Sequence, residues 1–154
     1  MGDLQRTVEA EADAVLRFVE QLKLEQEALA NGETDKLIRF AESKGNISGE
    51  LGALATQRNS LLAALELAAD RAGIETWIER HPTNVGLPKA WARVLSLAAE
   101  ARELNRVNGE LIQIRMRHNT QALATLLSAS RPLNLYGPDG QTAPSSGRRI
   151  DDAV

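Results

Sequence analysis

The fold is decided by two stretches, LQRTVEAEADAVLRFVEQLKLEQEAL at residues 4–29 and LIRFAESKGNISGELGALATQRNSLLAALELA at residues 37–68. In both, a seam of residues recurs at alternating steps of four and three, the spacing of a coiled coil. Most seam positions are apolar. The short connection at 31–35 predicts that the two helices form an antiparallel pair.

Charged residues on the two seams predict the register of this pair. The residue numbers add up to 69 for Glu25 with Lys44 and for Glu11 with Arg58, and the same sum matches apolar positions with apolar positions. A slip by one heptad would break both charge pairs and place most of these charges opposite Leu or Phe. Leaving one member of a partly buried ion pair alone costs about 3–5 kcal/mol. We therefore expect these four residues to be structural register pairs that select alignment more than they add stability.

Glycine and proline predict the helix boundaries. Asn31-Gly32 and Gly73 are typical of helix C-termini, and no proline precedes Pro82. Three glycines inside the second helix, Gly45, Gly49 and Gly52, indicate either a locally weak helix or the close approach of a third one. The predicted helices cover about residues 3–31, 34–71, 74–81 and 88–130.

The predicted fold class is all-α, an elongated antiparallel three-helix coiled-coil bundle with a short extra helix and an extended C-terminal tail. The helical bundle is expected over residues 1–131. Gly, Pro, Ser and Thr dominate residues 132–154, which predicts an extended or flexible tail. Aromatic residues make up only 3% of the 154, so the core must be mainly aliphatic.

Composition also narrows the function. The net charge of −3 and the lack of clustered Lys and Arg argue against nucleic acid as a partner. The chain has no cysteine and two histidines, so we expect no metal site, no cofactor and no enzymatic activity. No basic leader precedes an apolar segment, and no apolar run approaches the roughly 20 residues of a membrane span. We expect a cytoplasmic protein without membrane insertion.

The helix expected over 88–130 has a wide apolar stripe that is interrupted by Asn105 and Asn108. A helix that packs on one hairpin needs a narrower stripe, so the surplus apolar surface indicates a further contact. That contact is either a partner helix or a fourth packing element, such as the short helix or another copy of the chain. Buried asparagines could also fix the alignment of packed helices.

Three segments resemble the FlgN family of flagellar export chaperones. They are LNRVNGELI at 104–112, LYGPDGQT at 135–142 and GRRI at 147–150. The end of the first helix, with Glu25 through Leu29, and the bases Lys44 and Arg58 are similar to that family as well.

The resemblance implies a chaperone that binds the C-terminal helix of hook-associated (hook–filament junction) flagellar proteins. It would prevent their premature assembly and deliver them to the flagellar export gate, as a monomer or weak dimer. The family's binding region maps onto the third long helix, and Tyr136 corresponds to its export-gate docking tyrosine. The residues expected to bind the substrate protein are Asn105, Asn108, Leu111, Ile112, Met116, Leu123, Leu126 and Leu127.

Two alternatives belong to other functional classes. A structural coiled-coil adaptor or oligomerisation module would bury the third long helix against another copy. A phosphotransfer domain would carry phosphate on His118, although Asn119-Thr120-Gln121 lacks the Lys-Gly that such domains place after the histidine.

Overall fold

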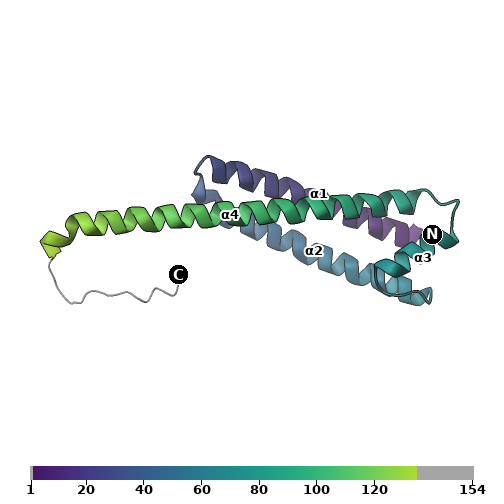
Figure 1. Ribbon diagram of the computed structural model, residues 1–154. Coiled ribbons are helices and arrows are strands. Elements are labelled where there is room, and N and C mark those ends of the chain that lie inside the picture. Colours follow the sequence, from purple (N-terminus) through teal and green to yellow (C-terminus); the bar gives the residue numbers. More distant parts are fainter. Residues whose placement is uncertain (1, 135–154) are drawn as a thin grey trace. The chain divides into compact units, whose positions relative to one another are not determined.

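The computed structural model describes residues 2–134, with side chains described as far as residue 128. This part of the chain is helical and contains no strand, which confirms the all-α class. Tyr136 and the other tail residues lie outside the described part. The elements are α1 (Gly2–Ala30), the 3-10 turn η1 (Thr34–Lys36), α2 (Leu37–Ala64), α3 (Arg71–Arg80) and α4 (Gly86–Asn134) (Figure 1).

The internal contacts divide the chain into two units, of which the first is Met1–Ile112 and the second begins at Gln113. The first unit contains α1, α2, α3 and the first part of α4. The division falls inside α4, whereas the composition predicted a boundary after residue 131. The position of this division follows from the direction in which α4 packs on α1.

α4 runs parallel to α1 within the first unit. Arg93 donates a hydrogen bond to Asp13 at 3.1 Å, and Asn108 donates one to Glu25 at 2.9 Å, so the contacting residues are 80 and 83 positions apart. A nearly constant difference in residue number means that the helices point the same way. With a difference of 83, the last residue of α1, Ala30, corresponds to residue 113. The first unit therefore ends where α1 ends.

The core of the first unit lies around α1 and is best packed at one end. One cluster joins all four helices, and it contains Leu4, Val8, Ala12, Leu62, Ile74, Trp77, Leu87, Ala90, Trp91 and Val94. A second, smaller cluster contains Val15, Val19, Leu22 and Ala101. α1 is the most buried helix because α2 and α4 both pack on it, while only Ile47 and Leu62 of α2 are buried.

The predicted end of the first helix is confirmed at Gly32. Its φ of 74° lies in the left-handed region, where glycine has no Cβ to clash. The amide of Gly32 donates to the carbonyl of Leu29, and the amide of Glu33 donates to the carbonyl of Ala28. These two bonds form a Schellman motif, which caps the last carbonyls of α1.

The second helix ends at Ala64, so its predicted end at residue 71 is wrong. The amide of Leu67 donates to the carbonyl of Leu62, and the amide of Glu66 donates to the carbonyl of Ala63. This is a second Schellman motif, with Glu66 at φ 60° in the place that glycine usually takes. Leu67 also packs against the cluster that contains Leu62. The sequence gives no glycine at this position, so the usual signal was absent.

Gly73, which predicted a helix end, lies in the first turn of α3. Asp70 caps this helix, since its side chain accepts a hydrogen bond from the amide of Gly73 at 3.2 Å. A Cβ at position 73 would lie 1.8 Å from the carbonyl oxygen of Ala68. The glycine is therefore explained by the close approach of the α2–α3 connection.

The remaining differences concern α2 and the end of α4. A Cβ added at Gly45, Gly49 or Gly52 would meet nothing within 4 Å, so none of the described helices approaches closely there and the glycines weaken α2. α4 continues to Asn134, past the predicted end near residue 130. Pro132 thus falls in its last turn, where a proline removes one backbone hydrogen bond near an end that frays in any case.

The left-handed conformation at Glu66 provides a test of the α2 end. Glu66→Gly is expected to raise the free energy of unfolding by about 0.5–1 kcal/mol, because glycine removes the Cβ clash but adds freedom to the unfolded chain. Urea denaturation at neutral pH measures this. Glu66→Ala keeps the clash and is the matched control. An equal gain in the alanine variant would mean that the charge, and not the backbone, is responsible.

Candidate partner-binding helix and the polar clusters beside it

The part of α4 in the first unit presents one heptad line to the hairpin. Leu87, Val94, Ala101 and Asn108 are each seven residues apart, and all four are buried. The amide of Leu87 donates to the side chain of Asn84 at 2.9 Å, which holds the start of α4. The side chains on the line thus change from large and apolar at its start to a polar asparagine at its end.

The first polar cluster joins the three long helices near the large core. Arg58 of α2 donates from Nη1 to Glu11 Oε2 of α1, and its guanidinium lies 5.5 Å from the ring centroid of Trp91 in α4. Such a cation–π contact contributes about 0.5–2 kcal/mol. Burial raises the pKa of Glu11 above its ordinary value, and the attraction of Arg58 offsets this only in part. Glu11 Oε1 and Trp91 Nε1 are buried without a hydrogen-bond partner within the described residues.

The second polar cluster joins the same helices closer to the hairpin connection. Lys44 Nζ of α2 donates to Glu25 Oε1 of α1 at 3.0 Å, and Asn108 Nδ2 of α4 donates to the same oxygen at 2.9 Å. Asn108 Nδ2 also donates to the carbonyl of Leu22 at 2.8 Å. Glu25 and Asn108 are 2% and 1% exposed. Both ion pairs that share the residue sum of 69 are thus present.

The predicted binding residues of the first unit fall into two groups. Asn108 is buried and hydrogen-bonded to α1, so its side chain is not on the surface of the described helices. Asn105, three residues earlier, is exposed, while Leu111 and Ile112 are half-buried. The two asparagines of the LNRVNG segment therefore lie in opposite environments. Sequence alone does not distinguish them, because both fall on the wide apolar stripe.

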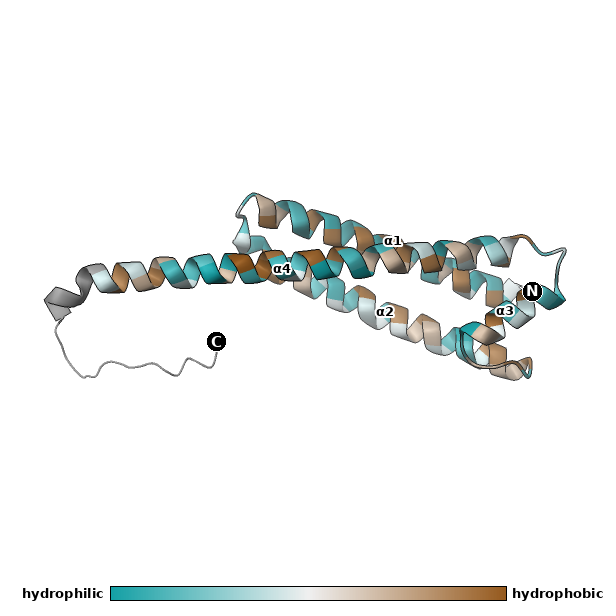
Figure 2. Cartoon of the chain, viewed as in Figure 1, coloured by the Kyte–Doolittle hydropathy of each residue, from teal (hydrophilic) through white to brown (hydrophobic). Residues whose placement is uncertain are grey.

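The predicted binding residues of the second unit are exposed apolar side chains. Met116, Leu123, Leu126 and Leu127 are 62%, 59%, 67% and 55% exposed. Residues three, four and seven apart lie on one side of a helix, so these four share a face. We call this set the apolar face of α4. Figure 2 shows hydrophobic residues recurring along this half of the helix.

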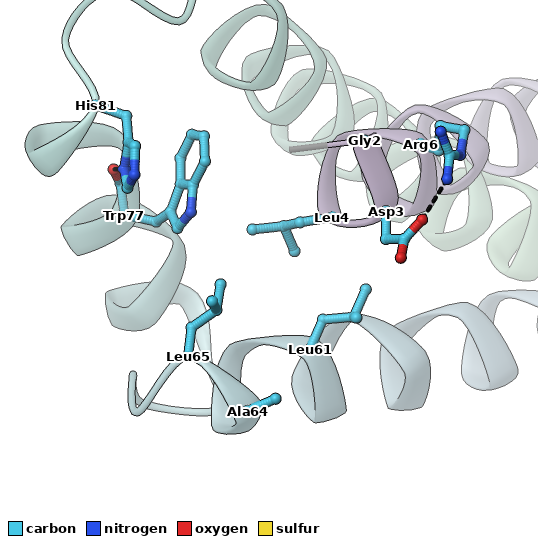
Figure 3. Close-up of a pocket in the computed structure, with 9 residues that line it drawn as sticks. All are labelled: Gly2, Asp3, Leu4, Arg6, Leu61, Ala64, Leu65, Trp77 and His81. Atoms are coloured by element: carbon cyan, nitrogen blue, oxygen red, sulfur yellow. Dashed lines mark hydrogen bonds and ion pairs between the residues drawn. The ribbon is translucent and has the colours of Figure 1, made fainter.

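A cleft that the sequence did not predict lies among the ends of α1, α2 and α3. Its volume is about 590 Å³, and its apolar wall includes Leu4, Leu61, Leu65 and Trp77 (Figure 3). His81 stacks on Trp77 with ring centroids 3.9 Å apart, and its Nδ1 lies 2.8 Å from the carbonyl oxygen of Trp77. None of the predicted site residues lines this cleft.

Neither a metal centre nor a membrane span is found in the described part of the chain. No three side chains of the types His, Cys, Asp and Glu gather there in a way that could hold an ion. Among the helices from Gly2 to Asn134, none is both long and apolar enough to cross a bilayer.

The burial of Glu11 predicts how stability depends on pH. A raised pKa means that the folded state binds the proton more tightly, so this residue's contribution is fully present below pH 4.5 and is lost as the pH rises through the folded-state pKa. Glu11→Gln imitates the protonated form. The stability of the wild type relative to this variant, measured by urea denaturation, should therefore fall as the pH is raised.

Glu50 is the matched control for this experiment. Its carboxylate accepts a hydrogen bond from Arg17 at 2.6 Å, which lowers the pKa of Glu50. The stability of the wild type relative to Glu50→Gln should change little with pH, because the pair is exposed, and any change should have the opposite sign. If the Glu11 difference rises with pH instead, the attraction of Arg58 outweighs the cost of burial.

Comparison with known proteins identifies the family. A family model described as FlgN protein matches residues 1–144. The chain is 32% identical to the flagella synthesis protein FlgN of Yersinia enterocolitica serotype O:8, over 90% of this chain and 92% of that protein. It is 32% identical to FlgN of Salmonella typhimurium over 70% and 78% of the two chains, and 27% identical to FlgN of Proteus mirabilis over 97% and 98%. No solved structure matches. On the extent of these matches, the chain belongs to the FlgN family.

Proposed function

We propose that this protein is a cytoplasmic flagellar export chaperone that binds the C-terminal helical segment of hook-associated proteins. It keeps these subunits from assembling prematurely and delivers them to the export gate. The family membership supports a role in flagellum synthesis. The observation that carries the binding proposal is the apolar face of α4.

The apolar face suits an amphipathic helix as its ligand. Four large aliphatic side chains more than half exposed on one helix face form a patch of a kind that soluble proteins usually cover. An amphipathic partner helix would bury its own apolar side against them. Leu and Met side chains adapt to small changes in the bound surface, which suits a chaperone with more than one client.

An oligomerisation module is the second candidate, because another copy of the chain could cover the same face. The two candidate functions differ in what covers the apolar face of α4. A chaperone covers it with a subunit helix and is itself a monomer or weak dimer, whereas an oligomerisation module forms a stable oligomer without any subunit.

Replacing two leucines of the apolar face tests the binding proposal. In Leu123→Glu/Leu127→Glu, the affinity for a peptide with the last 40 or so residues of a hook-associated protein should fall by a factor of about 100 or more. Each leucine contributes about 1.5–3 kcal/mol when buried, and a charge would be buried in its place. Isothermal titration calorimetry measures the affinity.

The control for this variant is Ile38→Glu, which changes an apolar residue that is 74% exposed at the start of α2. It should leave the affinity unchanged. An equal loss in both variants would argue against a specific surface on α4. A wild-type oligomer that light scattering finds at all concentrations, with no affinity for the peptide, would favour the oligomerisation module.

Tyr136, which lies outside the described residues, is proposed to dock on the export gate, as the family resemblance implies. Tyr136→Ala should leave peptide affinity within about twofold of the wild type, because a separate segment binds the subunit. Capture of the chaperone by the cytoplasmic part of the gate should be lost, since a tyrosine anchor typically contributes about 2 kcal/mol or more. Pull-down with the gate component measures this. A loss of peptide affinity would show that the two roles are not separated.

A further inference from the structure

Glu25 Oε1 is a single acceptor that holds three helices together. It accepts from Lys44 Nζ at 3.0 Å and from Asn108 Nδ2 at 2.9 Å, and it is buried in α1. The second hydrogen of the Asn108 amide goes to the carbonyl of Leu22 at 2.8 Å. Both donors of Asn108 are thus used on α1, one of them on a charged acceptor. Hydrogen bonds to charged groups contribute about 1.5–3 kcal/mol, which is more than neutral ones do.

The residues of α4 around Asn108 are less buried than those of α1 that they face, where Leu22 and Leu29 are 0% and 1% exposed. The nearest buried residue on its heptad line is Ala101, a small side chain. Leu104, Leu111 and Ile112 are only half-buried, and the residues of α1 that could cover α4 end at Ala30. In contrast, the start of α4 is held by Leu87 and Trp91 in the large core cluster. The hydrogen bonds of Asn108 are therefore the fully buried contact of α4 at this end of the first unit.

We infer that Asn108 is a latch, a residue whose hydrogen bonds hold residues 104–112 of α4 on the hairpin. With the latch closed, residues 104–112 stay on the hairpin, and the segment from Gln113 onward is left as a separate unit. With the latch open, the half-buried Leu104, Leu111 and Ile112 become exposed. Asn108 is a positioning residue in this scheme, and it does not touch the partner.

The chemistry of Asn108 suits a reversible attachment. Its Oδ1 is buried without a hydrogen-bond partner within the described residues, so the closed state carries a desolvation cost. When the latch opens, Glu25 keeps its ion pair with Lys44 and is not left as an isolated buried charge. The carbonyl of Leu22 lies within α1, where a helical hydrogen bond satisfies it. Opening thus avoids the large penalty of stranding a charge.

A consequence for binding follows, and it rests on the proposed function. The latch determines how long a stretch of α4 a subunit helix can cover. When it is closed, the apolar face starts at Met116. When it is open, the face gains Ile112, four residues before Met116, and becomes longer by about one helical turn.

Hydrogen exchange of the whole protein without any partner tests the latch. In Asn108→Ala, the backbone amides of residues 104–112 should exchange about tenfold faster or more, because the energy of two hydrogen bonds is lost. The amides of residues 87–101 should keep their wild-type rates. Asn105→Ala is the matched control, since it removes the same side chain from an exposed position of the same segment, and it should leave both regions unchanged.

A second variant separates hydrogen bonding from packing. Asn108→Leu fills the site but cannot donate, so residues 104–112 should again exchange faster if the latch depends on the amide. Wild-type rates in Asn108→Leu, or an equal acceleration over 87–101 in Asn108→Ala, would overturn the inference and make Asn108 an ordinary core residue. Peptide affinity of the wild type is measured separately. If the wild type does not bind the peptide, that result counts against the proposed function and leaves the hydrogen-exchange result unaffected.

Discussion

The structure depends on two carboxylates of α1 that are buried among three helices. Glu11 and Glu25 lie fourteen residues apart, and each meets a base of α2. α4 then completes each cluster in a different way, with the ring of Trp91 at one and the amide of Asn108 at the other. A buried carboxylate without a partner would cost several kcal/mol. The hairpin register that pairs both carboxylates with a base is therefore strongly preferred over registers in which the helices are shifted along each other. These clusters orient the helices, while the aliphatic core supplies most of the stability.

This arrangement limits how much of α4 the bundle can cover. Because α4 runs parallel to α1, the surface available to it ends when α1 ends, near the position that corresponds to residue 113. α4 nevertheless continues to Asn134 and carries large apolar residues after that point. Among the described residues, these apolar side chains remain more than half exposed, which is the observation that supports the proposed binding of a partner helix. The FlgN family membership supports a role in flagellum synthesis, and the apolar face of α4 supports the proposed binding of a partner helix.

The differences between prediction and structure have particular physical causes. The end of α2 was missed because Glu66 adopts a left-handed conformation, which its Schellman hydrogen bonds and the packing of Leu67 compensate. Gly73 was misread because a glycine is needed for a close approach as often as for a helix end, and local sequence does not distinguish the two. Trp91 lies three residues before Val94 on the apolar stripe of α4, so its burial could be predicted from the spacing. Its contact with Arg58 of α2 could not be predicted, because the sequence does not show which residues of these two helices meet.

The sequence by itself determined the helical class, the end of α1 at Gly32 and the register of the hairpin. Each of these depends on local spacing or on pairing between α1 and α2, which a short loop connects. It also carried the motifs by which the family is identified. Only the tertiary structure decided which of two similar asparagines is buried, where α4 ceases to pack and that a cleft lies between α1, α2 and α3. These features depend on how far the helices overlap and in which direction α4 runs along α1. Such relations join residues about 80 positions apart, and no local pattern encodes them.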